Sequence, residues 1–163
     1  MQIKIIRSHR RKRTVSARMD KDVLLVHAPL MISHERLGRI IDDLRSRFER
    51  KKLKEELERK QDLSEITAAL NQKYFDNKLK INSIAYTHNQ NRQFGCCSYR
   101  EGDIRISHRV GLMPKWVRNY VLVHEMAHLI VPNHSKAFWE IVSRYKLTER
   151  ARGYLLAAGL KII

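Results

Sequence analysis

Apolar and polar side chains alternate along the first thirty residues, which is the pattern of β-strands that bury one face. The alternation covers residues 14–19 and 23–27, and Asp20-Lys21-Asp22 lies between these two stretches as a turn. The pattern predicts a β-hairpin or a three-stranded meander over residues 2–30, ended by Pro29.

A long charged helix is expected from residue 33 to about residue 60. Ser33 is a favoured N-cap residue, and apolar side chains recur after it at helical spacing. They form a stripe of Ile40, Ile41, Leu44, Phe48, Leu53 and Leu57. The pattern predicts a helix that buries one face and carries charged side chains at pairing distance on the other.

The charged stretch at residues 50–60 has few apolar side chains and suits a helical linker. We therefore place a domain boundary near Gln61. Residues 1–60 would form an appendage of a β-hairpin and a long helix, and residues 61–163 would form the main domain. A chain of 163 residues supports one domain of full size with a small appendage.

The main domain mixes helical and strand patterns, which predicts an α+β fold. The expected elements are helices near 63–75, after Pro114, near 135–145 and near 148–158, and strands near 80–87, 92–98 and 103–107. The apolar segment from Tyr154 to Ile163 is expected to pack as core, and a position over a cleft is the alternative.

Charge adds a partner class to this picture. The formal net charge is +16, from 33 Lys and Arg against 17 Asp and Glu, which favours polyanions as partners. The densest basic cluster comprises Arg7, Arg10, Arg11, Lys12 and Arg13. It is a candidate site for DNA or RNA, or for an acidic membrane surface, and a solvated basic hairpin is the alternative.

Neither a secretory signal nor an apolar run of membrane-spanning length occurs in the sequence, so we expect no integral membrane association. Cys96 and Cys97 are adjacent, which fits neither a disulfide framework nor a CxxC metal site. We expect a cytoplasmic monomer in which both thiols are packing residues, and a redox or ligand role for one of them is the alternative.

The strongest chemical signal is an HExxH motif within the apolar run from Val121 to Ile130. Residues four apart lie on one face of a helix, so His124 and His128 are placed to hold one metal ion. Glu125 is rotated off that face and suits a base that acts on a water at the metal. Pro132-Asn133 forms a turn that brings back His134, the third ligand that a catalytic zinc site needs.

Two other interpretations of these residues compete with the metal site. The histidines could be core side chains satisfied by hydrogen bonds, but a metal with its water would satisfy two buried histidines and a buried glutamate together. Glu140 is a rival third ligand on the next helix, although an exposed carboxylate is its default role.

The chain resembles the YgjP-like (WrpP-like) metallopeptidases, which are related to the SprT-like and minigluzincin zinc peptidases. The stretch from Tyr120 to His128, followed by Asn133-His134-Ser135 and Phe138-Trp139, is similar to the family signature YVxxHExxH…NHSxxFW. Phe94-Gly95-Cys96-Cys97-Ser98 is similar to the family's WGSCS strand, with phenylalanine for tryptophan and cysteine for serine.

Weaker similarities extend the match over nearly the whole chain. Residues 7–16 with Ala28-Pro29 resemble the family's basic opening hairpin, and Tyr74-Phe75 with Leu79 resembles an element shared with SprT-like proteins. The resemblance implies a zincin-like core, a small mixed sheet packed on the HExxH helix, with an N-terminal hairpin and long-helix appendage. It implies that His124, His128 and His134 bind zinc and that Glu125 is the catalytic base.

The expected activity is hydrolysis of peptide bonds in a peptide or protein substrate. Zinc would lower the pKa of its bound water, and Glu125 would move the proton to the leaving amine. We expect Asp103–Ser107 to be an exposed sheet edge to which an extended substrate adds. Tyr145, His108 and Arg109 are candidate oxyanion stabilisers.

Two other functions are alternatives: a zinc-dependent nucleotide hydrolase, and a nucleic-acid-binding module with a structural metal site. The absence of a Gly-rich phosphate loop disfavours the first, and an intact Glu125 disfavours the second. The most complete reading is a zinc peptidase that its basic appendage recruits to nucleic acid, as in SprT-like proteases.

Overall fold

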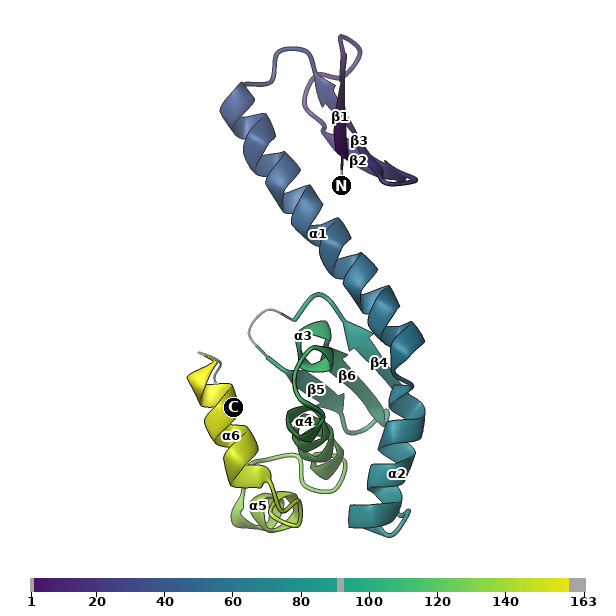
Figure 1. Ribbon diagram of the computed structural model, residues 1–163, viewed down its shortest axis with the longest axis vertical. Coiled ribbons are helices and arrows are strands. Elements are labelled where there is room, and N and C mark those ends of the chain that lie inside the picture. Colours follow the sequence, from purple (N-terminus) through teal and green to yellow (C-terminus); the bar gives the residue numbers. More distant parts are fainter. Residues whose placement is uncertain (1, 91–92, 159–163) are drawn as a thin grey trace. The chain divides into compact units, whose positions relative to one another are not determined.

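The computed structural model describes residues 2–90 and 93–158, and its contacts divide the chain into two units. The first unit extends to Lys52, and the second begins at Leu53, inside the long helix α1 (His34–Lys60). Each unit has its own three-stranded sheet (Figure 1). Each unit also has its own hydrophobic core. Leu57 packs in the core of the second unit. The domain division expected at Gln61 remains a prediction.

The sheet of the first unit contains β1 (Gln2–Ser8), β2 (Ser16–Asp20) and β3 (Val23–Pro29) in the order β1-β3-β2. β2 and β3 form the expected hairpin, but β1 pairs parallel to β3, so the prediction of a meander is wrong. β3 is the most apolar of the three strands and takes the centre of the sheet, where both of its edges are paired.

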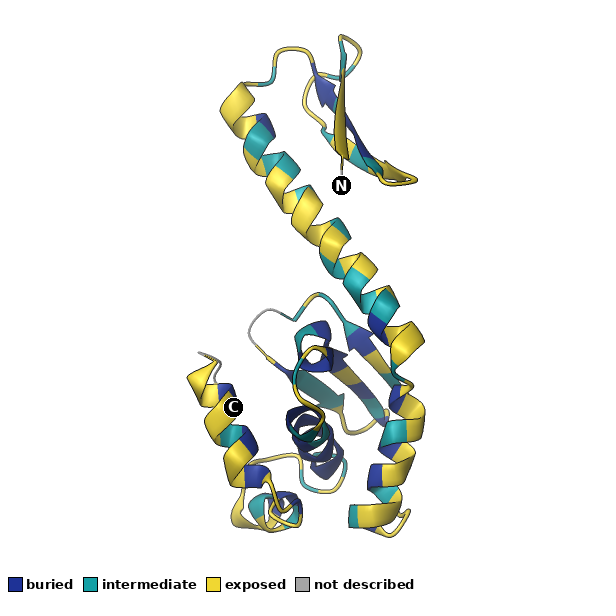
Figure 2. Ribbon diagram, in the orientation of Figure 1, coloured by how far each residue is buried: buried dark blue, intermediate teal, exposed yellow. Residues whose placement is uncertain are grey.

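Alternate residues of β3 form the core of the first unit. Leu24, Val26 and Ala28 are fully buried and pack with Leu37 of α1. Further along α1, the expected stripe of Ile41, Leu44 and Phe48 covers the same cluster. Most of α1 is otherwise exposed (Figure 2) and carries ion pairs four residues apart. The helix therefore buries one face, as its sequence pattern predicts.

A glutamine joins α1 to α2 (Leu63–Phe75). The Gln61 Nε2 donates to the carbonyl of Gly111 at 3.0 Å, and its Oε1 accepts from the Tyr86 hydroxyl at 2.6 Å and from Arg118 Nη1 at 2.8 Å. Directly after it, the Asp62 carboxylate accepts from the first backbone amides of α2 and caps that helix. Gln61 is thus a packed joint within the second unit.

The sheet of the second unit contains β4 (Ser83–Thr87), β5 (Gly95–Ser98) and β6 (Asp103–Ser107) in the order β4-β6-β5. β6 is the central strand, parallel to β4 and antiparallel to β5, so the expectation that Asp103–Ser107 forms a sheet edge is wrong. Ile104 and Ile106 are fully buried, which a central strand allows. The edge strand of the sheet that lies next to the HExxH helix is β5. The sequence predicts this strand at residues 92–98, and residue 92 lies outside the described residues.

Four helices complete the second unit: α3 (His108–Gly111), α4 (Lys115–Ala127), α5 (Lys136–Val142) and α6 (Thr148–Ala157). The α4 helix contacts β5, α5 and α6 and is buried nearly all round (Figure 2). The α3 helix was not predicted, because four residues are too few to show a helical period. The resulting α+β fold is the one expected from the sequence.

The C-terminal apolar segment is described only as far as residue 158. Leu155 is fully buried, whereas Tyr154 and Leu156 on the same helix are exposed. Residues 159–163, which belong to the same expectation, lie outside the described residues. Among the described helices, none combines the length and apolar character needed to span a membrane.

Candidate metal centre

The HExxH motif lies on the buried face of α4 at its C-terminal end. His124 and Glu125 are 6% and 7% exposed, because α4 packs between β5 and the helices that follow it. The helix ends at Ala127, but His128 keeps a right-handed helical backbone as its C-cap. The spacing of one helical turn therefore persists, and the rings of His124 and His128 lie 5.1 Å apart.

The turn after α4 brings the third histidine to the other two. One nitrogen from each of His124, His128 and His134 lies within 4.8 Å of the others, and the Nε2 atoms of His124 and His134 are 3.1 Å apart. Glu140, the rival ligand, is exposed on α5 and is not part of this cluster. The structure thus brings together the three histidines that the spacing singled out.

The histidine cluster suits a metal ion. Nitrogens bound to one tetrahedral metal at about 2.0–2.1 Å lie about 3.3 Å from each other, close to the separation of His124 and His134. His128 Nδ1 faces the carbonyl of Val131 at 3.3 Å, which leaves Nε2 directed at the cluster. Burial, together with the neighbouring histidines, lowers the pKa of His124 to about 3, so its imidazole stays neutral, as a ligand must be.

Two aromatic side chains of α5 hold the imidazoles. Phe138 stacks on the His128 ring with centroids 4.5 Å apart, and Trp139 stacks on the His134 ring at 5.8 Å. The Arg152 guanidinium lies over the Trp139 ring at 4.9 Å. These residues were expected to be packing residues, and their packing orients the histidines.

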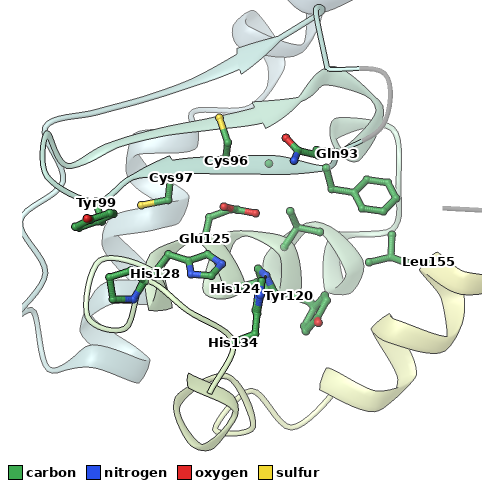
Figure 3. A pocket seen from close by; sticks show the side chains of 14 residues that line it. Gln93, Cys96, Cys97, Tyr99, Tyr120, His124, Glu125, His128, His134 and Leu155 are labelled. Carbon is green, nitrogen blue, oxygen red and sulfur yellow. The ribbon is translucent and has the colours of Figure 1, made fainter. Parts of the chain in front are cut away.

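Glu125 points into a cavity between α4 and β5 (Figure 3). Burial raises the pKa of this carboxyl to about 8. A glycine makes room for it: a Cβ atom on Gly95 would lie 2.6–2.7 Å from the Cγ, Cδ and Oε1 atoms of Glu125, closer than real contacts allow. Gly95 belongs to the strand signature Phe94-Gly95-Cys96-Cys97-Ser98. The sequence did not predict that this glycine makes room for Glu125, because no local pattern places β5 against α4.

The cavity has a volume of about 250 Å³ and contains all three histidines and Glu125. The remaining residues that line it include Gln93, Phe94, Cys97, Tyr99, Tyr120, Val121 and Leu155. None of the three candidate oxyanion stabilisers does so: Tyr145, for example, donates its hydroxyl to the carbonyl of Trp116 at 2.8 Å. Tyr120, which was expected only to pack, lines the cavity one helical turn before His124.

The two thiols differ in their surroundings. Cys96 Sγ is 3.0 Å from the amide nitrogen of Gln90, while Cys97 points toward the side of the cavity where Glu125 lies (Figure 3). Burial, together with the nearby charge of Glu125, raises the pKa of Cys97 to about 12. Cys97 is therefore protonated and unreactive, in agreement with the expected packing role.

The basic cluster lies in the first unit, in and directly after β1. The Arg7 guanidinium donates to the carbonyls of Leu30 at 2.8 Å and Ile32 at 3.4 Å and so holds the segment between β3 and α1. Arg10, Lys12 and Arg13 are exposed, and Arg11 is partly buried. Of the five predicted contacts to nucleic acid, Arg7 thus has a structural function in its own unit.

Comparison with known proteins identifies the family. Residues 32–151, about three quarters of the chain, match the YgjP-like, metallopeptidase domain family. The chain belongs to the YgjP-like family. This confirms the resemblance read from the HExxH and NHSxxFW motifs, and it makes the protein a metallopeptidase, a hydrolase of peptide bonds. No curated protein sequence matches the chain significantly.

A solved structure supports the fold of this YgjP-like protein. The protein is similar to the crystal structure of the metallopeptidase zymogen abylysin of Pyrococcus abyssi, with a TM-score of 0.52 and 18% sequence identity. The match covers 61% of this chain and 98% of abylysin. At this identity the likeness concerns the fold alone. It confirms the expected fold, in which a small mixed sheet packs on the HExxH helix.

Proposed function

We propose that this YgjP-like protein is a zinc peptidase in which His124, His128 and His134 bind the metal and Glu125 is the general base. The observation that carries the proposal is the placement of three imidazoles and a buried carboxylate around one cavity. Three protein nitrogens with space beside them are typical of catalytic zinc sites. Zinc bound there would activate water and polarise the substrate carbonyl.

Glu125 has the position that a general base needs. Its carboxylate shares the cavity with the imidazoles and comes from the same helix as His124, so the two side chains are fixed relative to each other. In the proposed reaction Glu125 accepts the proton of the attacking water and delivers it to the leaving amine.

The substrate is proposed to bind as an extended strand along β5. This strand is the edge of its sheet, and Gly95, Cys96 and Cys97 of β5 line the cavity. Main-chain hydrogen bonds to an edge strand hold a peptide with little dependence on its sequence. Flexible or unfolded segments are therefore the expected protein substrates.

The lining of the cavity disfavours the two alternative functions. None of the described residues that line it is Lys or Arg, so the site offers no side-chain cation for the phosphates of a nucleotide. A structural metal site is normally closed by four protein ligands, and it requires neither a cavity nor a buried carboxylate beside the metal.

The proposal is tested by incubating the zinc-loaded protein with an unfolded protein and following cleavage. Glu125→Gln should lower the rate by about 10²–10⁴-fold while zinc content stays the same, because it removes the base and keeps the ligands. Glu140→Gln is the matched control and should leave both quantities unchanged. Equal cleavage by wild type and Glu125→Gln would contradict the proposal.

Recruitment to nucleic acid is the second part of the proposal, and the exposed side chains of Arg10, Lys12 and Arg13 support it. Replacing residues 10–13 with serine should abolish salt-sensitive binding of single-stranded DNA or RNA and leave cleavage of a peptide unchanged. Binding should weaken steeply with salt, because phosphate contacts release counterions. If the wild-type protein binds neither DNA nor RNA at low salt, recruitment to nucleic acid is refuted.

Cytoplasmic location and a monomeric state likewise remain predictions.

A further inference from the structure

The cavity of the metal centre has two chemically different ends. The three histidines and Glu125 form the polar end. The apolar end is formed by Phe94, Tyr120, Val121 and Leu155, and Figure 3 shows Tyr120 and Leu155 on the side of the imidazoles away from Cys97 and Tyr99. A substrate carbonyl at the polar end would thus have an apolar recess beside it.

The apolar end is a built feature of the fold. Its four side chains are between 0% and 7% exposed and come from separate parts of the chain. Tyr120 and Val121 belong to α4, one helical turn before His124, while Leu155 reaches the cavity from α6 and Phe94 precedes β5. Because these residues are packed in the core, the recess is formed before a substrate binds.

Charge and size restrict what this recess accepts. The protein carries 33 Lys and Arg residues, yet among the described lining residues Glu125 is the only acidic one and no lysine or arginine occurs. A charged substrate side chain would lose its hydration there without gaining a partner of opposite charge at the apolar end. A cavity of about 250 Å³ is smaller than those that enclose whole ligands and suits a single side chain.

We propose that the apolar end binds the substrate side chain next to the scissile bond and selects residues such as leucine, methionine and phenylalanine. Aspartate, glutamate, lysine and arginine are rejected at that position. Backbone pairing with β5 gives the substrate its direction, and the recess decides where along the strand it is cut. The inference rests on the peptidase function proposed above.

The first test is a cleavage-site profile. The zinc-loaded protein is incubated with a mixture of unfolded proteins, and mass spectrometry identifies the residues on both sides of each cut. Apolar residues should exceed charged residues by about 10-fold or more at one of the two positions flanking the cut, because pockets of this kind discriminate by such factors.

Substitutions of Leu155 test whether the recess sets this preference. Leu155→Ala enlarges it and should shift the profile toward phenylalanine and tryptophan, while Leu155→Phe narrows it and should shift the profile toward alanine and valine. Leu156→Ala is the matched control, since Leu156 is the next residue on α6, is 62% exposed and does not line the cavity. Circular dichroism and thermal unfolding confirm that each variant is folded.

A binding measurement makes the test independent of turnover. Glu125→Gln keeps the ligands and the recess but should not cut, so fluorescence anisotropy can compare two labelled peptides that differ only by leucine or arginine at the selected position. The leucine peptide should bind about 10-fold or more tightly. Equal binding of both peptides would overturn the inference even if the Leu155 variants fail to fold.

The outcomes separate the two proposals. If the wild-type protein cuts and Glu125→Gln does not, but the profile shows charged residues or no preference, the peptidase stands and the apolar recess is refuted. Unchanged profiles for both folded Leu155 variants refute it as well. If the wild-type protein cuts nothing, the proposed peptidase falls and the recess loses its function with it.

Discussion

The two units of this YgjP-like protein contain sheets of the same topology but different surroundings. In each sheet the third strand in sequence is central, pairs parallel to the first and antiparallel to the second. In the first unit one helix covers the core, and the edge strands β1 and β2 are largely exposed. In the second unit the edge strand β5 faces the buried helix α4. The cavity of the candidate metal centre therefore depends on what packs at the sheet edge, and strand order alone does not provide it.

The largest effect is expected on zinc affinity when a histidine of the second unit is replaced, and a histidine of the first unit serves as the control. His134→Ala removes one of the three proposed ligands and should weaken zinc binding by about 10³-fold or more, since loss of a residue that only hydrogen-bonds to a ligand already costs 10–100-fold. His27→Ala changes a partly buried histidine of β3 in the first unit and should leave zinc affinity unchanged. Competition with a colorimetric chelator measures both. Equal affinities for wild type and His134→Ala would show that another residue completes the site.

Removal of the metal should increase hydrogen exchange in the second unit and leave it unchanged in the first. Adding a chelator to the zinc-loaded protein should increase exchange in α4 and β5, because the metal stabilises only the folded second unit by mass action. Exchange in β1 and β3 should not change. Faster exchange throughout the first unit would show that the two units are thermodynamically coupled.

A core substitution in each central strand should have a large but local effect. Leu24 in β3 and Ile104 in β6 are both fully buried, so replacing either with alanine should lower the free energy of unfolding of its unit by about 2–5 kcal/mol. Leu24→Ala should melt the small first unit and preserve peptide cleavage, whereas Ile104→Ala should reduce cleavage. Exchange protection measured strand by strand, together with activity, distinguishes these results. Loss of cleavage in Leu24→Ala would contradict independent units.

A glycine pair isolates the close packing of β5 on α4. Gly95→Ala should lower kcat by about 10²-fold with unchanged zinc content, because the added methyl group displaces Glu125 and a shift of about 1 Å is that costly. Gly38→Ala in α1 meets nothing within 4 Å and should stabilise the helix by about 0.5–1 kcal/mol. A fully active Gly95→Ala would mean that the strand or Glu125 moves without functional loss.

These contrasts also show how far the sequence reached. Local signals identified the HExxH helix, the turn that returns His134, the α1 stripe and the hairpin between β2 and β3, because spacing along one element fixes them. The parallel pairing of β1 with β3, the central position of β6 and the contact of Gly95 with Glu125 depend on packing between segments distant in sequence. No periodicity encodes such contacts. The family resemblance supplied the architecture but not these details.

The smallest expected effect lies within the basic cluster. Arg7 donates to the carbonyls of Leu30 and Ile32, so Arg7→Ala should destabilise the first unit by about 0.5–1.5 kcal/mol, the usual net value of such bonds. Arg10 is exposed, and Arg10→Ala should leave stability unchanged. Binding to single-stranded DNA should be weakened more by Arg10→Ala than by Arg7→Ala. Arg10→Ala should reduce the slope of the logarithm of affinity against the logarithm of salt concentration by about one, because one counterion fewer is released. If Arg7→Ala and Arg10→Ala lower the salt slope equally, the guanidinium of Arg7 must contact phosphate as well as the backbone carbonyls. If they also change stability equally, the structural difference between Arg7 and Arg10 is refuted.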